Sequence, residues 1–148
     1  MKIQTKFFGQ IECEEAQVIS FPVGIPGFPN EKKFLLLPFA DSESVMLCLQ
    51  SVTTSELAFV VLDPFRFNNS YTPVLQPAEL QQLGVKSSEE LYYYVLCAVH
   101  NPVSESTVNL RCPVVINPNT LEGRQIIMDT DEYDMRHPLR EFSGGAKC

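Results

Sequence analysis

The sequence predicts a mainly β domain, organised as a small barrel-like or pseudo-barrel structure with one or two short helices. Two observations support this prediction. Short runs rich in Val, Ile, Leu, Phe and Tyr recur along the 148 residues, and polar or proline- and glycine-containing turns bound them. Only one segment carries clear signals for both a helix start and a helix stop. Many strands with so few helices favour a closed barrel or a sandwich.

The N-terminal residues predict a hairpin, a short strand and a loop. Residues 3–13 form strand-like runs broken at Gly9, which indicates a hairpin or a bulge, and residues 18–21 follow as a short strand. Residues 22–29 contain three prolines and two glycines. Because proline removes backbone donors and glycine permits positive φ, this segment cannot be regular structure. We expect a defined loop with an exposed apolar rim.

Three continuous apolar runs come next. They cover residues 34–37, 45–49 and 57–62. A polar turn at residues 41–44 separates the first two runs. Short apolar runs bounded by turns are typical of strands that are buried on both faces. Asp63 ends the third run, where an aspartate usually accepts hydrogen bonds from the backbone donors of a turn.

Residues 77–83 predict the one clear helix. Pro77 suits the first helical position, and Gly84 suits the position just beyond the C-terminal end. Leu80 and Leu83 fall on one face of this helix. A second short helical turn is expected at residues 88–91.

The C-terminal third predicts three more strands. They cover residues 92–99, 107–117 and 124–128. Pro113 lies inside the second of them, which indicates an edge position or a bulge because proline cannot donate to a sheet ladder. The last two strands should form a hairpin through the loop 118–123, with Asn119 and Gly123 as its positive-φ residues.

Length and composition predict a single cytoplasmic domain. A chain of this size buries roughly 70% of its unfolded surface and needs no metal or disulfide to hold its core. We expect the domain to cover residues 1–142, followed by a disordered tail over residues 143–148. No secretory signal and no segment of membrane-spanning length is present in the sequence, so we expect no membrane partner.

The charge of the chain favours protein partners over nucleic acids. The 11 Lys and Arg residues against 18 Asp and Glu residues give a formal charge of −7. An acidic surface repels phosphate backbones, which disfavours direct binding of nucleic acid. It attracts a basic protein partner and speeds their encounter, although the same charge can also serve solubility alone.

Five cysteines occur, and their pattern indicates free thiols in a reducing compartment. They are Cys13, Cys48, Cys97, Cys112 and Cys148. The count is odd and no pair has the C-x-x-C spacing of a zinc site. The first four lie in apolar or alternating runs, as small buried hydrophobic residues do.

The motifs of common enzymes are missing from this sequence, so we expect no catalysis, no metal and no cofactor. Two alternatives remain open. A small-molecule-binding or enzymatic barrel would use Asp63, Arg136 and His137, and would need a deep polar pocket that gathers them. A purely structural subunit would need a large exposed apolar patch and a stable oligomer.

The residues from 129 to 134 are strongly acidic. Four carboxylates occur in this segment: Asp129, Asp131, Glu132 and Asp134. Their spacing matches part of the pattern of a calcium-binding loop. The central glycine of that pattern is missing, and Arg140 stands at the position of its bidentate glutamate. The segment is therefore a solvated turn or an acidic patch for a basic partner. Residues 12–15 offer a second acidic patch.

An ordered set of short motifs resembles the FliW family of flagellar assembly factors. The motifs are KIQTK at 2–6, FPVGIPGF at 21–28, FLLLP at 34–38, LQSV at 49–52, AFVVLDP at 58–64, NLRCPVVIN at 109–117, GRQ at 123–125 and RHPL at 136–139. The resemblance spans the chain up to Leu139. Cys112 departs from it, because a small residue such as alanine is common there in the family.

The resemblance implies a small β-barrel-like domain without catalysis that binds two proteins. Members of the family bind flagellin and the RNA-binding regulator CsrA, which represses flagellin translation. The resemblance implies that export of flagellin frees the factor to bind CsrA away from its RNA site, non-competitively with RNA. This binding relieves the repression of flagellin translation.

Three groups of residues are candidates for direct contact with a partner. Ile25 and Phe28 would form an exposed apolar pair in the loop 22–29. Asn109, Arg111 and Asn117 would form a polar group at a sheet edge. The acidic residues Asp129, Asp131, Glu132 and Asp134 make the third group. For the glycines and prolines of these motifs, a role in the fold alone is the favoured interpretation.

Overall fold

The computed structural model describes residues 1–39, 46–67, 70–102 and 105–139. The strands are β1 (Lys2–Thr5), β2 (Gly9–Glu12), β3 (Ile19–Ser20), β4 (Lys33–Pro38), β5 (Met46–Ser51), β6 (Ala58–Leu62), β7 (Tyr92–Ala98), β8 (Thr107–Val108), β9 (Val114–Asn117), β10 (Glu122–Gln125) and β11 (His137–Pro138). The helices are α1 (Pro64–Phe67) and α2 (Pro77–Gln82), with 3-10 turns η1 (Glu15–Gln17) and η2 (Ser88–Glu90). The predicted mainly β fold with short helices is confirmed. The predicted turn at 41–44 and tail at 143–148 lie outside the described residues.

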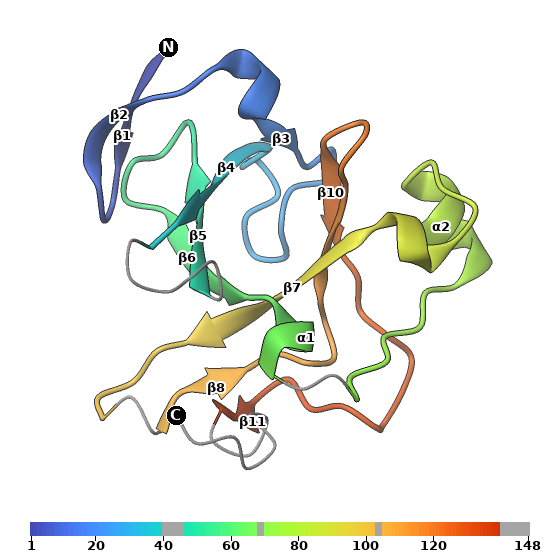
Figure 1. The fold of residues 1–148 in the computed structure, drawn as a ribbon. Coiled ribbons are helices and arrows are strands. Elements are labelled where there is room, and N and C mark those ends of the chain that lie inside the picture. The colour runs from blue at the N-terminus through green and yellow to red at the C-terminus, as the bar shows by residue number, and fades with distance from the viewer. Residues whose placement is uncertain (40–45, 68–69, 103–104, 140–148) are drawn as a thin grey trace.

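Seven strands close into a barrel. Their order is β7-β6-β5-β4-β3-β10-β9, and the pairing of β9 with β7 closes the ring (Figure 1). The pair β3–β10 is parallel, and the other pairs are antiparallel. Closure joins the two edges of the sheet, so the barrel needs no partner strand to satisfy its backbone.

The remaining strands lie at the periphery of the barrel. Strands β1 and β2 form a separate hairpin, seen at the upper left of Figure 1. Strand β8 pairs with the end of β7, and β11 pairs with β8 at the bottom of the same view. The segments after β7 and after β10 therefore meet at one end of the barrel, far from the N-terminal hairpin.

The barrel interior is packed with apolar side chains. Phe21 and Phe34 are fully buried there, with ring centroids 5.2 Å apart in an edge-to-face arrangement. Gly123 of β10 lies against the Phe21 ring, and a Cβ atom at this position would come within 2.8 Å of the ring. Because Gly123 has no side chain, the Phe21 ring has room in the barrel interior.

Two further clusters cover the outside of the barrel. Leu35 of β4 packs outward against Ile3 and Cys13 of the N-terminal hairpin. On another side, Val95 of β7 and Leu83 at the end of α2 belong to a second outer cluster. Because β4 faces the interior on one side and the N-terminal hairpin on the other, its sequence is a continuous apolar run, as predicted.

Gln50 is a fully buried polar residue that ties the N-terminal hairpin to the barrel. Its Oε1 accepts a hydrogen bond from the backbone N–H of Lys6 at 2.9 Å. Its Nε2 donates to the carbonyl oxygens of Ser51, Ser55 and Leu57 at 3.0–3.2 Å. One amide therefore satisfies backbone groups of both the hairpin turn and the β5–β6 connection.

Replacing Gln50 with leucine should lower the free energy of unfolding by about 1–3 kcal/mol, because buried backbone groups lose their partners. Amide exchange at Lys6 should accelerate in the same variant. Chemical denaturation and hydrogen exchange measure the two effects. The control is Gln4→Leu, since Gln4 is exposed and bonds only to the Gln10 side chain at 2.9 Å among the described contacts. Equal losses in both variants would refute the tethering role of Gln50.

The prediction of a single strand over residues 107–117 is wrong. The chain forms β8, then turns, and resumes as β9 after Pro113. The Oδ1 of Asn109 accepts a hydrogen bond from the backbone N–H of Cys112 at 3.0 Å, which stabilises the turn. Pro113 thus marks an interruption between two strands that pair with different parts of β7.

The positive-φ residues predicted for the loop 118–123 are also wrong. The left-handed residue is Leu121, with φ of 55°, and not Asn119 or Gly123. The backbone N–H of Leu121 donates to the Asn117 carbonyl at 2.9 Å, which closes the loop. The Leu121 side chain packs against the interior cluster, and this burial offsets the cost of its backbone conformation.

The helix predictions hold. Helix α2 begins at Pro77, and Gly84 follows it with φ of 74°. The expected short turn is η2, whose N-cap is Ser87. The four-residue α1 was not predicted, although Asp63 accepts from the backbone N–H of Phe65 at 3.0 Å as expected. Within the described part of the chain, no helix is long and apolar enough to cross a membrane.

The cysteines of the described residues are free thiols. Cys13, Cys48 and Cys112 are buried, and Cys97 is half-buried. Burial raises the pKa of the Cys48 and Cys97 thiols to about 11. These two thiols are therefore protonated at neutral pH and behave as small apolar groups rather than nucleophiles.

Candidate partner-binding surfaces

The loop 22–29 presents only one of its two predicted apolar contacts. Phe28 is 41% exposed, and its ring packs edge-to-face on Phe59 with centroids 5.7 Å apart. Ile25 is 2% exposed, so its predicted exposure is wrong. Gly24, with φ of 69°, turns the chain so that Ile25 enters the barrel interior. Phe28 stays a candidate contact, whereas Ile25 supports the fold.

Asn117 is likewise a buried residue and not an exposed edge residue. It is 2% exposed, and its Nδ2 donates to the Leu83 carbonyl at 2.7 Å. Its Oδ1 accepts from the backbone N–H of Asn119 at 2.9 Å. The amide therefore caps the end of α2 and the start of the following loop, and its burial keeps it from a partner.

Arg111 is half-buried and supports the acidic segment. Its Nε donates to the carbonyl of Met128 at 3.4 Å, and the N–H of Met128 donates back to the Arg111 carbonyl at 3.0 Å. Met128 directly precedes Asp129. Arg111 thus anchors the start of the acidic segment, and a direct contact with a partner stays a prediction.

The acidic segment is exposed and held in place. We call its four exposed carboxylates the acidic face: Asp129, Asp131, Glu132 and Asp134. Tyr133, between them, points inward with its ring 4.8 Å from that of Tyr71, and its hydroxyl accepts from the backbone N–H of Thr72 at 2.9 Å. The N–H of Leu110 donates to the Asp134 carbonyl at 3.0 Å. These contacts fix the backbone that carries the four charges.

An apolar residue borders the acidic face. Val74 is 68% exposed, and its backbone N–H contacts the Met128 sulfur at 3.3 Å. Val74, Asp129 and Glu132 line one small depression. A carboxylate group next to exposed apolar surface suits a basic protein that also has apolar groups.

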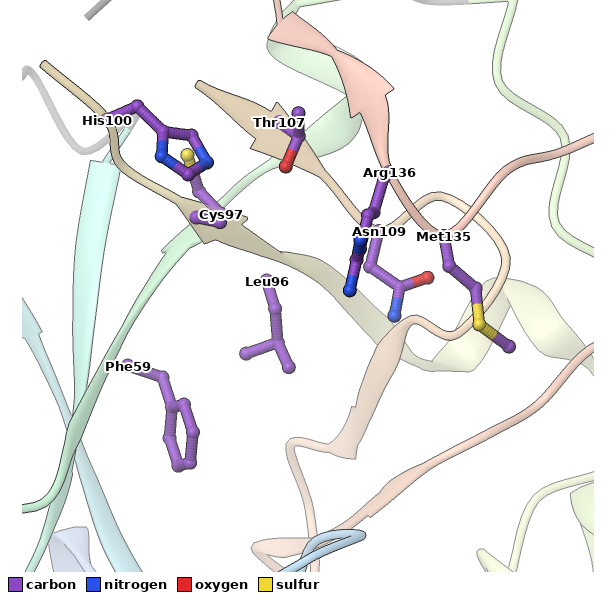
Figure 2. A pocket seen from close by; sticks show the side chains of 9 residues that line it. Phe59, Leu96, Cys97, His100, Thr107, Asn109, Met135 and Arg136 are labelled. Atoms are coloured by element: carbon purple, nitrogen blue, oxygen red, sulfur yellow. The ribbon is translucent and has the colours of Figure 1, made fainter. Parts of the chain in front are cut away.

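Beyond the acidic face the chain borders an open hollow of about 570 Å³. We call it the β7–β8 hollow, because β7 and β8 form two of its walls (Figure 2). Phe59, Leu96, Ala98 and Met135 contribute its apolar lining. Its polar lining comes from Thr107, Asn109, His100 and Arg136, with the protonated Cys97 thiol among them.

The residues of the enzymatic alternative do not share one pocket. Arg136 lines the β7–β8 hollow, whereas Asp63 lines a separate hollow with Phe65 and Tyr92. The Nδ1 of His137 lies 3.9 Å from a carboxylate oxygen of Asp134. No cluster of three or more potential metal-ligating His, Cys, Asp or Glu side chains occurs in the described ranges of the chain.

The β7–β8 hollow was not predicted from the sequence. Its walls come from residues near 59, 96–100, 107–109 and 135–136, which no local spacing connects. The hollow depends on the break between β8 and β9. The turn at Asn109 at this break allows β8 to lie beside the end of β7. Asn109 is the one predicted contact that lines this hollow.

A closed seven-stranded barrel with an apolar-filled interior and an anchored acidic surface defines a small β-barrel domain. The model of the family described as FliW protein matches residues 2–139. The chain therefore belongs to the FliW family of flagellar assembly factors.

Curated relatives and a solved structure agree with this family. The chain is 39% identical to a flagellar assembly factor FliW from Geobacillus sp. (strain WCH70), over 94% of this chain and 95% of the relative. It is 34% identical to the one from Bacillus subtilis (strain 168), over the full length of both chains. A crystal structure of the flagellar assembly factor FliW superposes with a TM-score of 0.87 at 37% identity, covering 94% of this chain and 96% of that chain.

Proposed function

We propose that this chain is a cytoplasmic, non-enzymatic factor that binds flagellin and, when free of flagellin, binds CsrA. Binding to CsrA is non-competitive with RNA, occurs away from the RNA site, and relieves the repression of flagellin translation. Membership of the flagellar assembly factor family supports this proposal. The anchored acidic face is the structural observation that supports the proposed binding to CsrA.

The acidic face suits a basic RNA-binding protein for a physical reason. Four carboxylates on a fixed segment, in a chain of formal charge −7, attract a basic surface over several ångströms. Once docked, the same charges add a repulsive field against RNA phosphates. An acidic protein can therefore weaken RNA binding without entering the RNA site.

The test neutralises three carboxylates of the acidic face. The triple variant Asp129→Asn, Asp131→Asn, Glu132→Gln should bind CsrA about tenfold more weakly, and its affinity should depend less on salt concentration. Isothermal titration calorimetry at two salt concentrations measures both effects. Circular dichroism and chemical denaturation should show an unchanged fold, since these side chains are exposed.

The control removes the same number of charges elsewhere. Glu12, Glu14 and Glu15 are also exposed; Glu12 ends β2 and Glu15 begins η1. Figure 1 shows β2 far from β11, the strand that follows the acidic face in the chain. Replacement of these three glutamates with glutamine should leave CsrA affinity within about twofold. Equal weakening by both triple variants would mean that only net charge matters. Unchanged binding of the first variant would remove the acidic face from the interface.

A further inference from the structure

The β7–β8 hollow differs in charge from the acidic face beside it. Arg136 and His100 are its basic lining residues, and no acidic residue among those described lines it. Arg136 is exposed, and its guanidinium has no hydrogen-bond or ion-pair partner among the described residues. The nearby Asp134 carboxylate lies 3.9 Å from His137 instead. A chain of formal charge −7 thus offers an unpaired cation beside an apolar recess.

The apolar part of the hollow can accept a side chain. Figure 2 shows Arg136 and Met135 beside Asn109, with Leu96 and Phe59 further along the same recess. Met135 is 48% exposed. The volume of about 570 Å³ is of the size that holds one or two large apolar side chains. Arginine at such a rim favours a carboxylate, which it can bind with two parallel hydrogen bonds.

We infer that the β7–β8 hollow is the flagellin-binding site, and that it takes a flagellin segment with an apolar side chain next to a carboxylate. The apolar side chain lies over Leu96 and Met135, and the carboxylate pairs with Arg136. This inference rests on the proposed function, in which the chain binds flagellin and CsrA. The basic surface of an RNA-binding protein would bring like charge to Arg136, so the hollow suits flagellin and the acidic face suits CsrA.

On this assignment the two partners would exclude each other, because their sites are adjacent. The acidic face ends at Asp134, and Met135 and Arg136 follow it directly in the chain. A folded protein that covers about 800 Å² on one of these surfaces must overlap the other. Mutual exclusion then needs no conformational change in the barrel.

The test uses full-length flagellin monomer, CsrA and two variants of the intact chain. Arg136→Glu and Met135→Asp should each bind flagellin at least about tenfold more weakly, because each places a carboxylate where the partner carboxylate or apolar side chain sits. Both should bind CsrA at least as tightly as the unaltered chain, because an added carboxylate beside the acidic face favours a basic partner. Lys86→Glu is the matched control, since it makes the same charge change at an exposed residue between α2 and η2, away from the hollow, and both affinities should persist.

Each other outcome has a definite meaning. If the unaltered chain binds flagellin and both variants bind it equally well, the hollow is not the site and the proposed function stands. If the variants lose CsrA and retain flagellin, the assignment of surfaces is reversed and the inference is overturned. If the unaltered folded chain binds no flagellin, the proposed function and the inference fall together. Circular dichroism of each variant confirms that any loss is not unfolding.

Discussion

Phe21→Ala is expected to lower the free energy of unfolding by about 3–5 kcal/mol, which would leave a domain of this size barely folded. The Phe21 ring is fully buried at the centre of the barrel and packs on Phe34 with centroids 5.2 Å apart. Gly123 lies against the ring from β10 and has no side chain to fill the space. Neighbouring strands are joined around the closed barrel, so they cannot collapse into the cavity.

Chemical denaturation of Phe21→Ala against the unaltered chain measures this loss. The control is Val23→Ala, two residues further on, because Val23 is 59% exposed and should change stability by about 0.5 kcal/mol or less. A loss below about 1 kcal/mol for Phe21→Ala would show that the interior repacks freely. The packing of Gly123 against Phe21 would then not be a determinant of the fold.

Gly24→Ala is expected to cost about 2–5 kcal/mol, from backbone strain and from overpacking. Gly24 has φ of 69°, a conformation that disfavours any side chain. A Cβ atom there would also lie 2.5 Å from the Phe28 carbonyl oxygen and 2.7 Å from that of Pro29. Because these are backbone atoms of the same tight loop, relief requires the loop to open.

Gly9→Ala separates the two causes. Gly9 has a similar φ of 66°, but no atom lies within 4 Å of a Cβ built there. It should cost only the strain of about 1–2 kcal/mol. Thermal or chemical unfolding of the two variants gives the difference directly. Equal losses would mean that the loop 22–29 moves aside easily and does not hold Ile25 inside the barrel.

The strands of this fold were predictable because a strand that is buried on both faces has a continuous run of apolar residues. The runs at 34–37 and 57–62 are apolar throughout since one face of each strand meets the barrel interior and the other meets a covering segment. The helix at Pro77 was predictable from its end signals. The break at Asn109 was not, because an asparagine side chain that closes a turn resembles one that fills a sheet.

The surfaces were harder to predict than the strands. Composition showed that the loop 22–29 is irregular, but not that Gly24 directs Ile25 inward and leaves Phe28 exposed. Charge predicted the exposure of the acidic segment correctly, because carboxylates are strongly hydrated and rarely buried. The β7–β8 hollow depends on three distant segments meeting at one end of the barrel, and no short motif encodes that meeting.

The proposed circuit depends on exclusion of one partner by the other. Calorimetric titration of this chain with CsrA, repeated in the presence of saturating flagellin monomer, tests it most directly. We predict tight binding of CsrA alone and no CsrA binding in the presence of flagellin. CsrA binding that persists at saturating flagellin would contradict mutual exclusion, and no heat with either partner from a folded sample would contradict the proposed function itself.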